Sequence, residues 1–471
     1  MIQNKKILDK FNELKAAWNP ADSESLFRLI DFENEIGASV ERASVPTLSD
    51  LPNLNANEGR LVYVESENKH YYSDGFSWSD DLSTVPSDVT LNLSFGANTD
   101  GLLGLGVSGI DVPFSREPIP SLLDVNPSVI SAGSYQTAVL SSGVIWGWGQ
   151  NFGGNLGDGT NADRSSPVSV IGEITDWVDV RASGYWVMAL RGDGTIWAWG
   201  SNRFGNLGDG TGGSGTRRSS PVSVIGGFTD WASIESSRYT AMAIRENGTL
   251  WAWGLNWSGG LGVGDGDYRS SPTEVLGGFT DWISIAPGYC SGGIRADGSL
   301  WTWGNNQSGE RLHGDIATYT YSPVSITDAS DWTSLYSDRF GWGGNLGDGW
   351  GFFFGIKNDG SVWGWGANKY GRLGDGTIED RSSPVSVIGG ITDWQKLSVG
   401  FYTVGAIRSD GSVWGWGSSY NNKPFFPESY GNIISIPTRI SSWGELADIS
   451  MGYSHGVAIK SATKGFDEFG S

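Results

Sequence analysis

The chain has 471 residues, with 31 Lys and Arg against 52 Asp and Glu, which gives a formal net charge of −21. This acidity argues against binding to nucleic acid or to an anionic membrane surface, because both need cationic contacts. The single cysteine excludes an intrachain disulfide, and no apolar run approaches the roughly 18 residues that a membrane-spanning helix needs.

The first 88 residues differ in texture from the rest. Apolar residues from Ile7 to Trp18 follow one helical stripe, and Asn19-Pro20 predicts the start of a second helix that ends near Gly37. We expect residues 1–40 to form a helical attachment or oligomerisation segment, or alternatively to dock under the domain that follows. Residues 41–88 predict a small β module of three short strands with turns at 67–68 and 73–75, so the two parts form a small α/β adaptor.

A pattern with two tryptophans two residues apart recurs through the rest of the chain. DGSVWGWG ends at Gly366 and again at Gly417, related copies end at residues 149, 200, 254 and 304, and a degraded copy ends at Gly96. Residues two apart in a strand lie on the same face, so each pair makes one face bulky and leaves Gly, Ala or Thr on the other. We expect the bulky faces to pack between neighbouring sheets.

An apolar strand precedes six of these copies, joined to each by Asp-Gly, Asn-Gly or Ser-Gly, which indicates a tight hairpin. A seventh such strand, residues 456–460, has no tryptophan strand after it, whereas residues 91–95 have no strand before them. The two complete each other if the chain closes into a ring. The repeat therefore predicts an all-β, seven-bladed β-propeller over residues 89–462, closed by its N- and C-terminal strands and followed by a tail of residues 463–471.

Two parts of the chain resemble known families. W-G-x-N-x-x-G-x-L-G, then Pro, then G-Y-x-x-x-A-L-x-x-D-G-x-(L/I/V)-W-x-W-G resembles the repeat of the regulator-of-chromosome-condensation family, a propeller with four-stranded blades. The acidic charge and the lack of a basic tail depart from its eukaryotic namesake, so exchange of nucleotide on a small GTPase is not expected. The tryptophan-rich repeats look more like the bacterial and viral members, which mostly bind other molecules. Residues 45–78 are similar to small modules of bacteriophage tail fibres.

No catalytic or metal-binding constellation emerges. The three histidines, His70, His313 and His455, lie in different segments. Acids recur from repeat to repeat, in GDG and TDW, which is typical of turns and caps rather than of a unique catalytic pair. GDGDY at residues 264–268 has some likeness to a calcium loop but lacks the EF-hand spacing and its closing Glu. We expect a protein without catalytic activity, cofactor or metal, while calcium binding by an Asp-Gly loop stays open.

Aromatic residues outside the repeat are the candidates for ligand contacts. From Trp332 to Gly351 is 19 residues, against seven between the matching Trp282 and Tyr289, which predicts a projecting loop that the blades do not need. The alternative is a loop that folds over the ring and buries its own aromatics. The predicted contacts, from this loop and elsewhere, are Phe340, Trp342, Trp350, Trp186, Trp257, Tyr268 and His455.

A column of varied residues begins the strand before each hairpin: Gln136, Trp186, Thr240, Cys290, Phe352, Thr403 and His455. The residue before it is Tyr in five repeats. We expect the constant tyrosines to serve packing, and the varied column to be surface that specialises for a ligand or has simply drifted.

These features predict a non-enzymatic binding protein, in particular a bacteriophage virion appendage (a tail-fibre, receptor-binding or decoration protein) whose propeller recognises a host-surface glycan or protein. A bacterial propeller that binds or inhibits a protein partner is the first alternative, and a carbohydrate-active enzyme is the second. We expect the N-terminal segment to bind other virion proteins and the chain to form a homo-oligomer, with a trimer favoured. The N-terminus lacks the apolar stretch of a signal peptide, so we expect synthesis in the host cytoplasm and localisation in the virion, without membrane insertion.

Overall fold

The structure is a computed structural model that describes most of the chain beyond its first 60 residues. The described residues are 61–64, 69–73, 78–79, 90–98, 101–104, 114–120, 127–312, 319–326, 330–338, 351–418, 433–440 and 443–461. The chain divides into two compact units, Met1–Leu91 with Ser461–Ser471, and Asn92–Lys460. The domain boundaries predicted at residues 40, 88 and 462 remain predictions.

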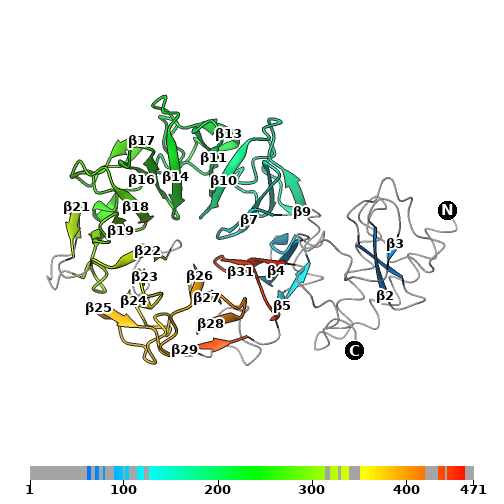
Figure 1. The fold of residues 1–471 in the computed structure, drawn as a ribbon. Coiled ribbons are helices and arrows are strands. Elements are labelled where there is room, and N and C mark those ends of the chain that lie inside the picture. The colour runs from blue at the N-terminus through cyan, green and yellow to red at the C-terminus, as the bar shows by residue number, and fades with distance from the viewer. Residues whose placement is uncertain are drawn as a thin grey trace. The chain divides into compact units, whose positions relative to one another are not determined.

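The described part of the first unit is a small antiparallel sheet. Its strands β1 (Leu61–Val64), β2 (Lys69–Ser73) and β3 (Trp78–Ser79) lie in sequence order, each paired with the next (Figure 1). The three short strands predicted for this module are therefore present. The two helices predicted within residues 1–40 lie outside the described residues.

The second unit is a ring of seven four-stranded antiparallel sheets, the blades, which confirms the predicted propeller (Figure 1). The first strands, which lie nearest the centre of the ring in blades 1 to 7, are β6 (Val129–Ala132), β10 (Trp177–Ala182), β14 (Trp231–Ser236), β18 (Trp282–Ala286), β22 (Trp332–Ser337), β26 (Trp394–Val399) and β30 (Asp448–Met451). The second strands are β7 (Gln136–Ser141), β11 (Trp186–Arg191), β15 (Thr240–Arg245), β19 (Cys290–Arg295), β23 (Phe352–Lys357), β27 (Thr403–Arg408) and β31 (His455–Ser461).

The tryptophan strands are third in each blade, and a polar strand forms the outer edge. The third strands are β8 (Val144–Gly149), β12 (Ile196–Gly200), β16 (Leu250–Gly254), β20 (Leu300–Asn305), β24 (Val362–Gly366), β28 (Val413–Ser418) and β4 (Thr90–Ala97). The fourth strands are β9 (Arg164–Ser169), β13 (Arg218–Ser223), β17 (Arg269–Glu274), β21 (Tyr319–Ser325), β25 (Arg381–Ser386), β29 (Ile433–Arg439) and β5 (Phe114–Pro120). A short 3-10 helix, η5 (Trp257–Gly259), follows β16. Within the described ranges, no helix has the length and apolarity to cross a membrane.

Blade 7 is assembled from both ends of the propeller sequence. Its strands lie in the order β30-β31-β4-β5, so the C-terminal strand β31 pairs with the N-terminal strand β4. The amide of Ala97 donates a 2.9 Å hydrogen bond to the carbonyl of Ser454, and the ring of Phe95 lies 4.6 Å from that of Trp443. The predicted closure is therefore confirmed. It leaves neither strand with an unpaired edge inside the ring.

The second tryptophan of each pair joins neighbouring blades. Each of these indoles is buried, and its N–H donates to a main-chain carbonyl in the loop of the preceding blade. The pairs are Trp148 to Leu102, Trp199 to Asn155, Trp253 to Asn206, Trp303 to Gly260, Trp365 to Glu310 and Trp416 to Arg372. The first tryptophan is only partly buried, and in blades 2 to 6 its N–H bonds the hydroxyl of its own hairpin, as Trp363 does with Ser361 at 2.9 Å. The expected packing between blades is therefore mainly the role of the second indole.

The centre of the ring is joined by serine side chains. The amide of Ala182 in β10 donates to Ser131 Oγ of β6, and the amide of Leu335 in β22 donates to Ser284 Oγ of β18. The same contact recurs from Ala132 to Ser450 and from Met451 to Ser398. Each first strand is paired with a neighbouring strand on one side only. The serine bonds satisfy amides on its other edge.

Candidate binding face

Tyrosines gather at one end of the ring, where each first strand turns into the second. Six tyrosines stand there: Tyr135, Tyr185, Tyr239, Tyr289, Tyr402 and Tyr453. The main-chain carbonyls of the first five accept hydrogen bonds from the loops that follow the third strands, as in the 2.8 Å bond from Ser201 N to Tyr185 O. All except Tyr402 are partly exposed. We call this end of the ring, with its turns and loops, the tyrosine face. The constant tyrosines were expected to serve packing, and Tyr135 and Tyr185 do stack on one another, although both remain partly exposed.

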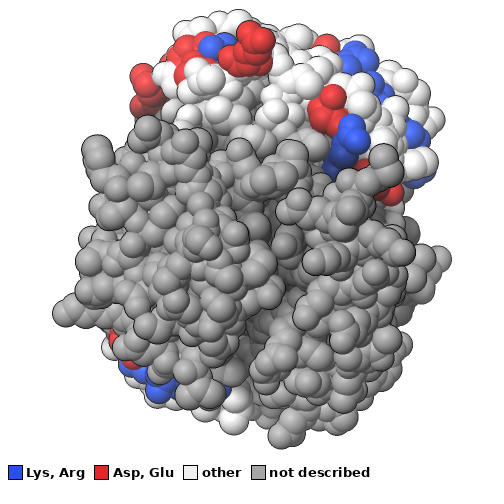
Figure 2. Space-filling view, turned by 90° about the vertical axis from the view of Figure 1, so that its right-hand side faces the viewer, with Lys and Arg blue, Asp and Glu red and all other residues white. Residues whose placement is uncertain are grey.

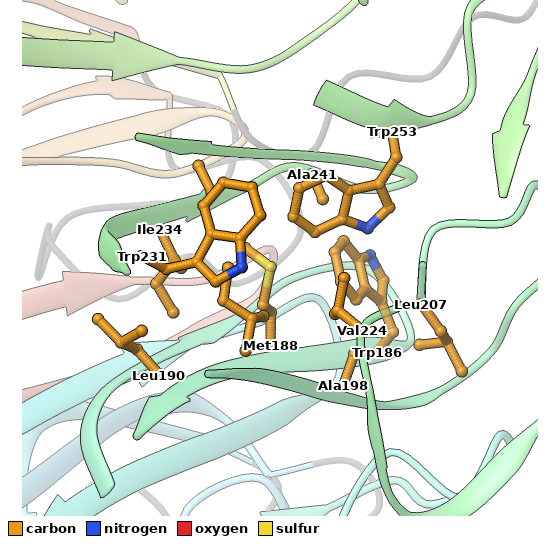
Figure 3. Close-up of a cluster of buried hydrophobic side chains, with 12 residues drawn as sticks. Trp186, Met188, Leu190, Ala198, Leu207, Val224, Trp231, Ile234, Ala241 and Trp253 are labelled. Atoms are coloured by element: carbon orange, nitrogen blue, oxygen red, sulfur yellow. The ribbon is translucent and has the colours of Figure 1, made fainter. Parts of the chain in front are cut away.

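The varied column next to these tyrosines is buried at all seven positions. Trp186 is 0% exposed, donates to the carbonyls of Ser237 and Arg238, and lies in one apolar cluster with Trp253 between blades 2 and 3 (Figure 3). His455 is 1% exposed, with its Nε2 2.9 Å from the hydroxyl of Thr137 in blade 1. The prediction that Trp186 and His455 contact a ligand is corrected by this burial. Their sites are joints between blades.

Aromatic rings form a series on the tyrosine face that runs from blade 2 through blades 1 and 7 to blade 6. Tyr135 stacks on Tyr185 with ring centroids 5.1 Å apart and lies 5.8 Å from Tyr453. Phe401 continues the series, 4.9 Å from Tyr453 and 4.4 Å from Tyr402. Burial, followed by the neighbouring Tyr135, raises the pKa of Tyr185. The Tyr185 phenol therefore stays neutral at physiological pH and offers a hydrogen bond together with apolar ring surface.

A second group of rings lies farther out on the tyrosine face, over blades 2 and 3. Phe204 is in contact with three rings, at centroid distances of 4.8 Å to Tyr239, 5.9 Å to Trp257 and 5.2 Å to Tyr268. Trp257 is 48% exposed and Tyr268 is 42% exposed. We call Phe204, Tyr239, Trp257 and Tyr268 the aromatic patch. Two of the predicted ligand contacts, Trp257 and Tyr268, are thus brought together on one surface.

The loop that presents Trp257 is set by its own sequence, N-W-S-G-G-L-G. Asn256 is buried, and its side chain accepts a 2.9 Å bond from the amide of Leu261 and donates a 2.7 Å bond to the carbonyl of Asp265. Gly259 has a φ of +78°, and a Cβ there would lie 2.3 Å from the carbonyl oxygen of Thr320. The bonds of Asn256 and the tight turn at Gly259 therefore fix the inner side of the loop. Only the residues after Asn256 are free to face outward.

Other blades carry aromatics at the equivalent place, namely Phe152, Phe204 and Tyr370. Phe204 and Tyr239 were missed as site residues from sequence alone. The signal that could have identified Phe204 is this position, two residues or fewer after the loop asparagine, where nothing in the repeat calls for an aromatic side chain.

The Asp-Gly loops are held by protein groups rather than built for a metal. Asp158 accepts bonds from Thr160 and Asn151 and forms a 2.7 Å ion pair with Arg164. Burial opposes the charge of this carboxyl, but the hydrogen bonds from Thr160 and Arg164 outweigh it, so the pKa of Asp158 is lowered. The same arrangement holds Asp209 with Arg218 and Asp375 with Arg381, and Asp265 of the GDGDY loop pairs with Arg269. A guanidinium thus stands where a calcium ion would need to bind. Within the described ranges, no group of three or more His, Cys, Asp or Glu could hold a metal.

The TDW aspartates also stabilise the blades, by joining the first strand to the second. Asp176 forms two hydrogen bonds with Arg191, at 2.9 and 2.8 Å, which tie the start of β10 to the end of β11. Equivalent pairs join Asp230 to Arg245, Asp281 to Arg295, Asp331 to Lys357 and Asp393 to Arg408. On the side of the molecule seen in Figure 2, acidic and basic atoms of described residues accordingly lie next to one another rather than in separate tracts.

The central channel contains a cavity of about 240 Å³, lined by first strands of blades 2 to 6. Arg181 bonds Asp179 and lies 3.1 Å from Glu235, so one guanidinium is shared by two carboxyl groups. Burial raises the pKa of Asp179 despite the nearby Arg181. Both acids share one guanidinium, so neither has the independent environment that a general acid and base pair requires.

The predicted projecting loop cannot be placed on this face. Phe340, Trp342 and Trp350 lie outside the described residues, so their role as ligand contacts stays a prediction. The strands on either side of the loop, β22 and β23, pair in the register of the other blades.

Comparison with known proteins identifies the repeat. The model of the regulator of chromosome condensation (RCC1) repeat matches residues 142–190, 193–244 and 359–407. These three segments are similar to RCC1 repeats. The ultraviolet-B receptor UVR8 of Arabidopsis thaliana is 25% identical over 362 residues, which are 70% of this chain and 74% of the receptor. The human E3 ubiquitin-protein ligase HERC2 is 24% identical over 370 residues, 77% of this chain but only 6% of the ligase.

Solved structures with RCC1-type propellers share the architecture. Human WBSCR16 aligns with a TM-score of 0.68 at 19% identity, covering 80% of this chain and all of that one. Prp20p of Saccharomyces cerevisiae, whose structure was described together with its binding to Gsp1p and histones, aligns at 0.67 and 18% identity over 80% of this chain and 92% of its own. At these identities the similarity establishes the fold, and propellers of this type are typical of proteins that bind or regulate other proteins.

Proposed function

We propose that this chain is a non-enzymatic binding protein that holds its partner on the tyrosine face of the propeller. The observation that carries the proposal is the aromatic patch, where Trp257 and Tyr268 are almost half exposed although the repeat does not require either ring. Aromatic side chains on a rigid frame provide a large contact area at low entropic cost. Loops held by a closed scaffold are the usual place for such contacts.

The relatives support binding rather than catalysis. Prp20p binds Gsp1p and histones, and its propeller has the same architecture as this one. The ligase activity named for HERC2 is not proposed here, because the chain spans only 6% of that protein. A carbohydrate-active enzyme would need an acid and a base in separate environments, which the Arg181 group does not provide.

The experiment is a screen of the purified chain against a glycan array and a displayed random-peptide library. The variants are Trp257→Ala and Tyr268→Ala, and the control is Ile283→Ala, which truncates an apolar side chain of similar exposure at the other end of a first strand. We expect each patch variant to weaken the selected ligands by about 2 kcal/mol with an unchanged melting temperature, and the control to bind as the wild type does. Ligands that bind both patch variants at full strength would contradict the proposal.

The setting that we propose for this binding is a bacteriophage virion appendage, with the propeller turned to a host-surface glycan or protein. Its supports are the likeness of residues 45–78 to tail-fibre modules and the likeness of the repeats to bacterial and viral members of the family. In this proposal, residues 1–40 attach the chain to other virion proteins and form a homo-oligomer, with a trimer favoured. Immunogold labelling of purified particles tests the localisation. Light scattering of a chain that starts near residue 86 tests the oligomer, because equal mass per assembly with and without residues 1–85 would contradict the attachment role.

A further inference from the structure

Two arginines on the tyrosine face stand apart from the regular ion pairs of the propeller. Arg203 is exposed and lies 5.3 Å over the ring of Phe204. Arg217 is also exposed, lies 4.4 Å over the ring of Phe152, and donates a 3.2 Å bond to the Phe152 carbonyl. Neither has a carboxylate partner among the described residues, although the TDW and GDG arginines do.

A shortage of acids does not explain these unpaired cations, because the chain has 21 more acidic than basic residues. The two GDG-type aspartates of this region are already engaged, Asp209 with Arg218 and Asp265 with Arg269. Two guanidinium groups are thus held on aromatic rings with their charge uncompensated. A charge kept in that state on a binding face favours a ligand of the opposite sign.

Both arginines belong to the surface that carries the aromatic patch. Arg203 precedes Phe204, the ring at the centre of the patch. Arg217 ends the same loop, which returns to Phe204 so closely that a Cβ on Gly212 would lie 3.9 Å from the carbonyl carbon of Phe204. The exposed ring of Phe152 extends this surface to blade 1.

The arrangement of the rings favours a side chain over a sugar. Phe204 meets its three neighbours at interplanar angles of 72°, 64° and 82°, so the rings stand edge to face and do not form one flat platform. Stacking of a sugar needs an open, flat ring face, whereas crevices between tilted rings accept an aliphatic or aromatic side chain. Tyr, Trp and Arg are also the residue types that dominate contacts between proteins.

We propose that the aromatic patch, with Arg203 and Arg217, binds an acidic segment of a partner protein. A bulky apolar side chain of the segment packs among Phe204, Trp257 and Tyr268, and neighbouring Asp or Glu carboxylates pair with the two guanidinium groups. This inference rests on the proposed function and adds the chemistry of the partner to it.

The test uses the full chain and short synthetic peptides in three matched series. Each peptide has one Trp or Leu flanked by acidic residues, by Gln at the same positions, or by Lys. Carboxylated and neutral oligosaccharides form a fourth and fifth set. The variants are Arg203→Glu and Arg217→Glu, and the control is Arg439→Glu, which makes the same change of charge at an exposed site on β29 of blade 6.

We expect the acidic series to bind the wild type best, with an affinity that falls as salt is added. Each of the two variants should weaken that binding about tenfold or more, as the loss of an ion pair in a contact does, while the control leaves it unchanged. Equal binding of the Gln series, no binding of any peptide, or an acidic series insensitive to both arginine variants would each overturn the inference.

Trp257→Ala separates this inference from the proposed function. If oligosaccharides or neutral peptides bind and this variant abolishes their binding, the tyrosine face is still a binding face and only the acidic-segment inference fails. If ligands bind and survive both Trp257→Ala and Tyr268→Ala, the proposed function itself fails.

Discussion

The indole N–H of Trp365 in blade 5 donates a 3.0 Å hydrogen bond to the main-chain carbonyl of Glu310 in the loop of blade 4. Both side chains are fully buried, so this bond is made away from water. Trp363, two residues earlier on the same strand face, is only half-buried and bonds the hydroxyl of Ser361 in its own hairpin. Two tryptophans that look equivalent in the repeat therefore hold different parts of the molecule.

Replacing each tryptophan by phenylalanine should separate these roles. Trp365→Phe keeps an aromatic ring but leaves the buried carbonyl of Glu310 without its donor, so we expect a loss of about 1–3 kcal/mol in the free energy of unfolding. Trp363→Phe should cost less than about 1 kcal/mol, because water can replace the lost bond at a half-buried site. Urea unfolding measures both. An equal or larger loss for Trp363→Phe would mean that the joint between blades is not the weak point.

Glu310 predicts a pH dependence of stability. Burial raises the pKa of Glu310 to about 7 from its ordinary value of 4.5, although hydrogen bonds from Ser308 and Asn305 favour the charged form. A carboxyl with the higher pKa in the folded state contributes stability that is complete below its unfolded pKa and is lost as pH rises through the folded pKa. The contribution of Glu310 to the free energy of unfolding should therefore fall by roughly 3 kcal/mol between about pH 4.5 and pH 7.

Glu310→Gln removes this titration, so its stability relative to the wild type should increase as pH rises through that window. Unfolding by urea at several pH values measures the difference. Glu379→Gln, at an exposed carboxyl of blade 5, is the control and should show no such trend. A constant difference between Glu310→Gln and the wild type across the window would rule out the raised pKa.

Closure of the ring predicts the effect of a C-terminal truncation. Removing residues 453–471 deletes β31 and exposes the edge of β4, so we expect loss of cooperative unfolding together with aggregation. Removing only residues 462–471 keeps the strand and should leave the melting temperature unchanged. Circular dichroism melting and light scattering compare the two. If the longer truncation melts like the full chain, pairing of β31 with β4 is not what holds the ring together.

The hairpin glycines predict a steric limit between blades. Gly360 has a φ of +77°, and a Cβ there would lie 1.9 Å from the carbonyl oxygen of Thr392, which leads into blade 6. Gly390 has a similar φ of +59° but nothing within 4 Å of its position. Alanine strains the backbone at both sites. Only at Gly360 does a clash add a further loss of about 1–3 kcal/mol in the free energy of unfolding. Equal melting temperatures for Gly360→Ala and Gly390→Ala would show that blade 6 can shift away from the new Cβ without loss of stability.

The paired Asp-Gly loops predict indifference to calcium. Asp375 already accepts hydrogen bonds from Thr377 and forms a 2.6 Å ion pair with Arg381. A calcium ion would have to displace this guanidinium. Differential scanning calorimetry with added calcium and with EDTA should give the same melting temperature. A rise with calcium that disappears in Asp375→Asn would identify this loop as a site.

Much of the fold could be predicted from the sequence because strand faces follow from alternation alone. The spacing of the glycines that end each tryptophan strand indicated the blades, and the unpaired strands near Phe95 and Val457 indicated the closure. Both predictions depend only on local strand geometry and on the spacing of a pattern that each blade repeats.

The candidate site was harder to predict because exposure depends on the neighbouring blade. Tyr185 and Trp186 are adjacent, and the constant residue indicated packing while the varied one indicated a free surface. The structure buries the varied residue, since blade 3 covers Trp186, and leaves Tyr185 partly exposed. Trp257 and Tyr268 could be selected because they fall outside the repeat, but their contact through Phe204 requires two blades to be placed side by side.

The acceptor in each indole joint is a main-chain carbonyl, an atom that every amino acid possesses. The residues that supply it, Leu102, Asn155, Asn206, Gly260, Glu310 and Arg372, range from no side chain to a long cationic one. The indole bond therefore makes no demand on the side chain of the residue that supplies the acceptor. Duplicating, removing or transplanting a whole blade would leave the docking interaction intact at the new boundary, so the propeller is built as a set of interchangeable modules whose surface loops are free to diversify.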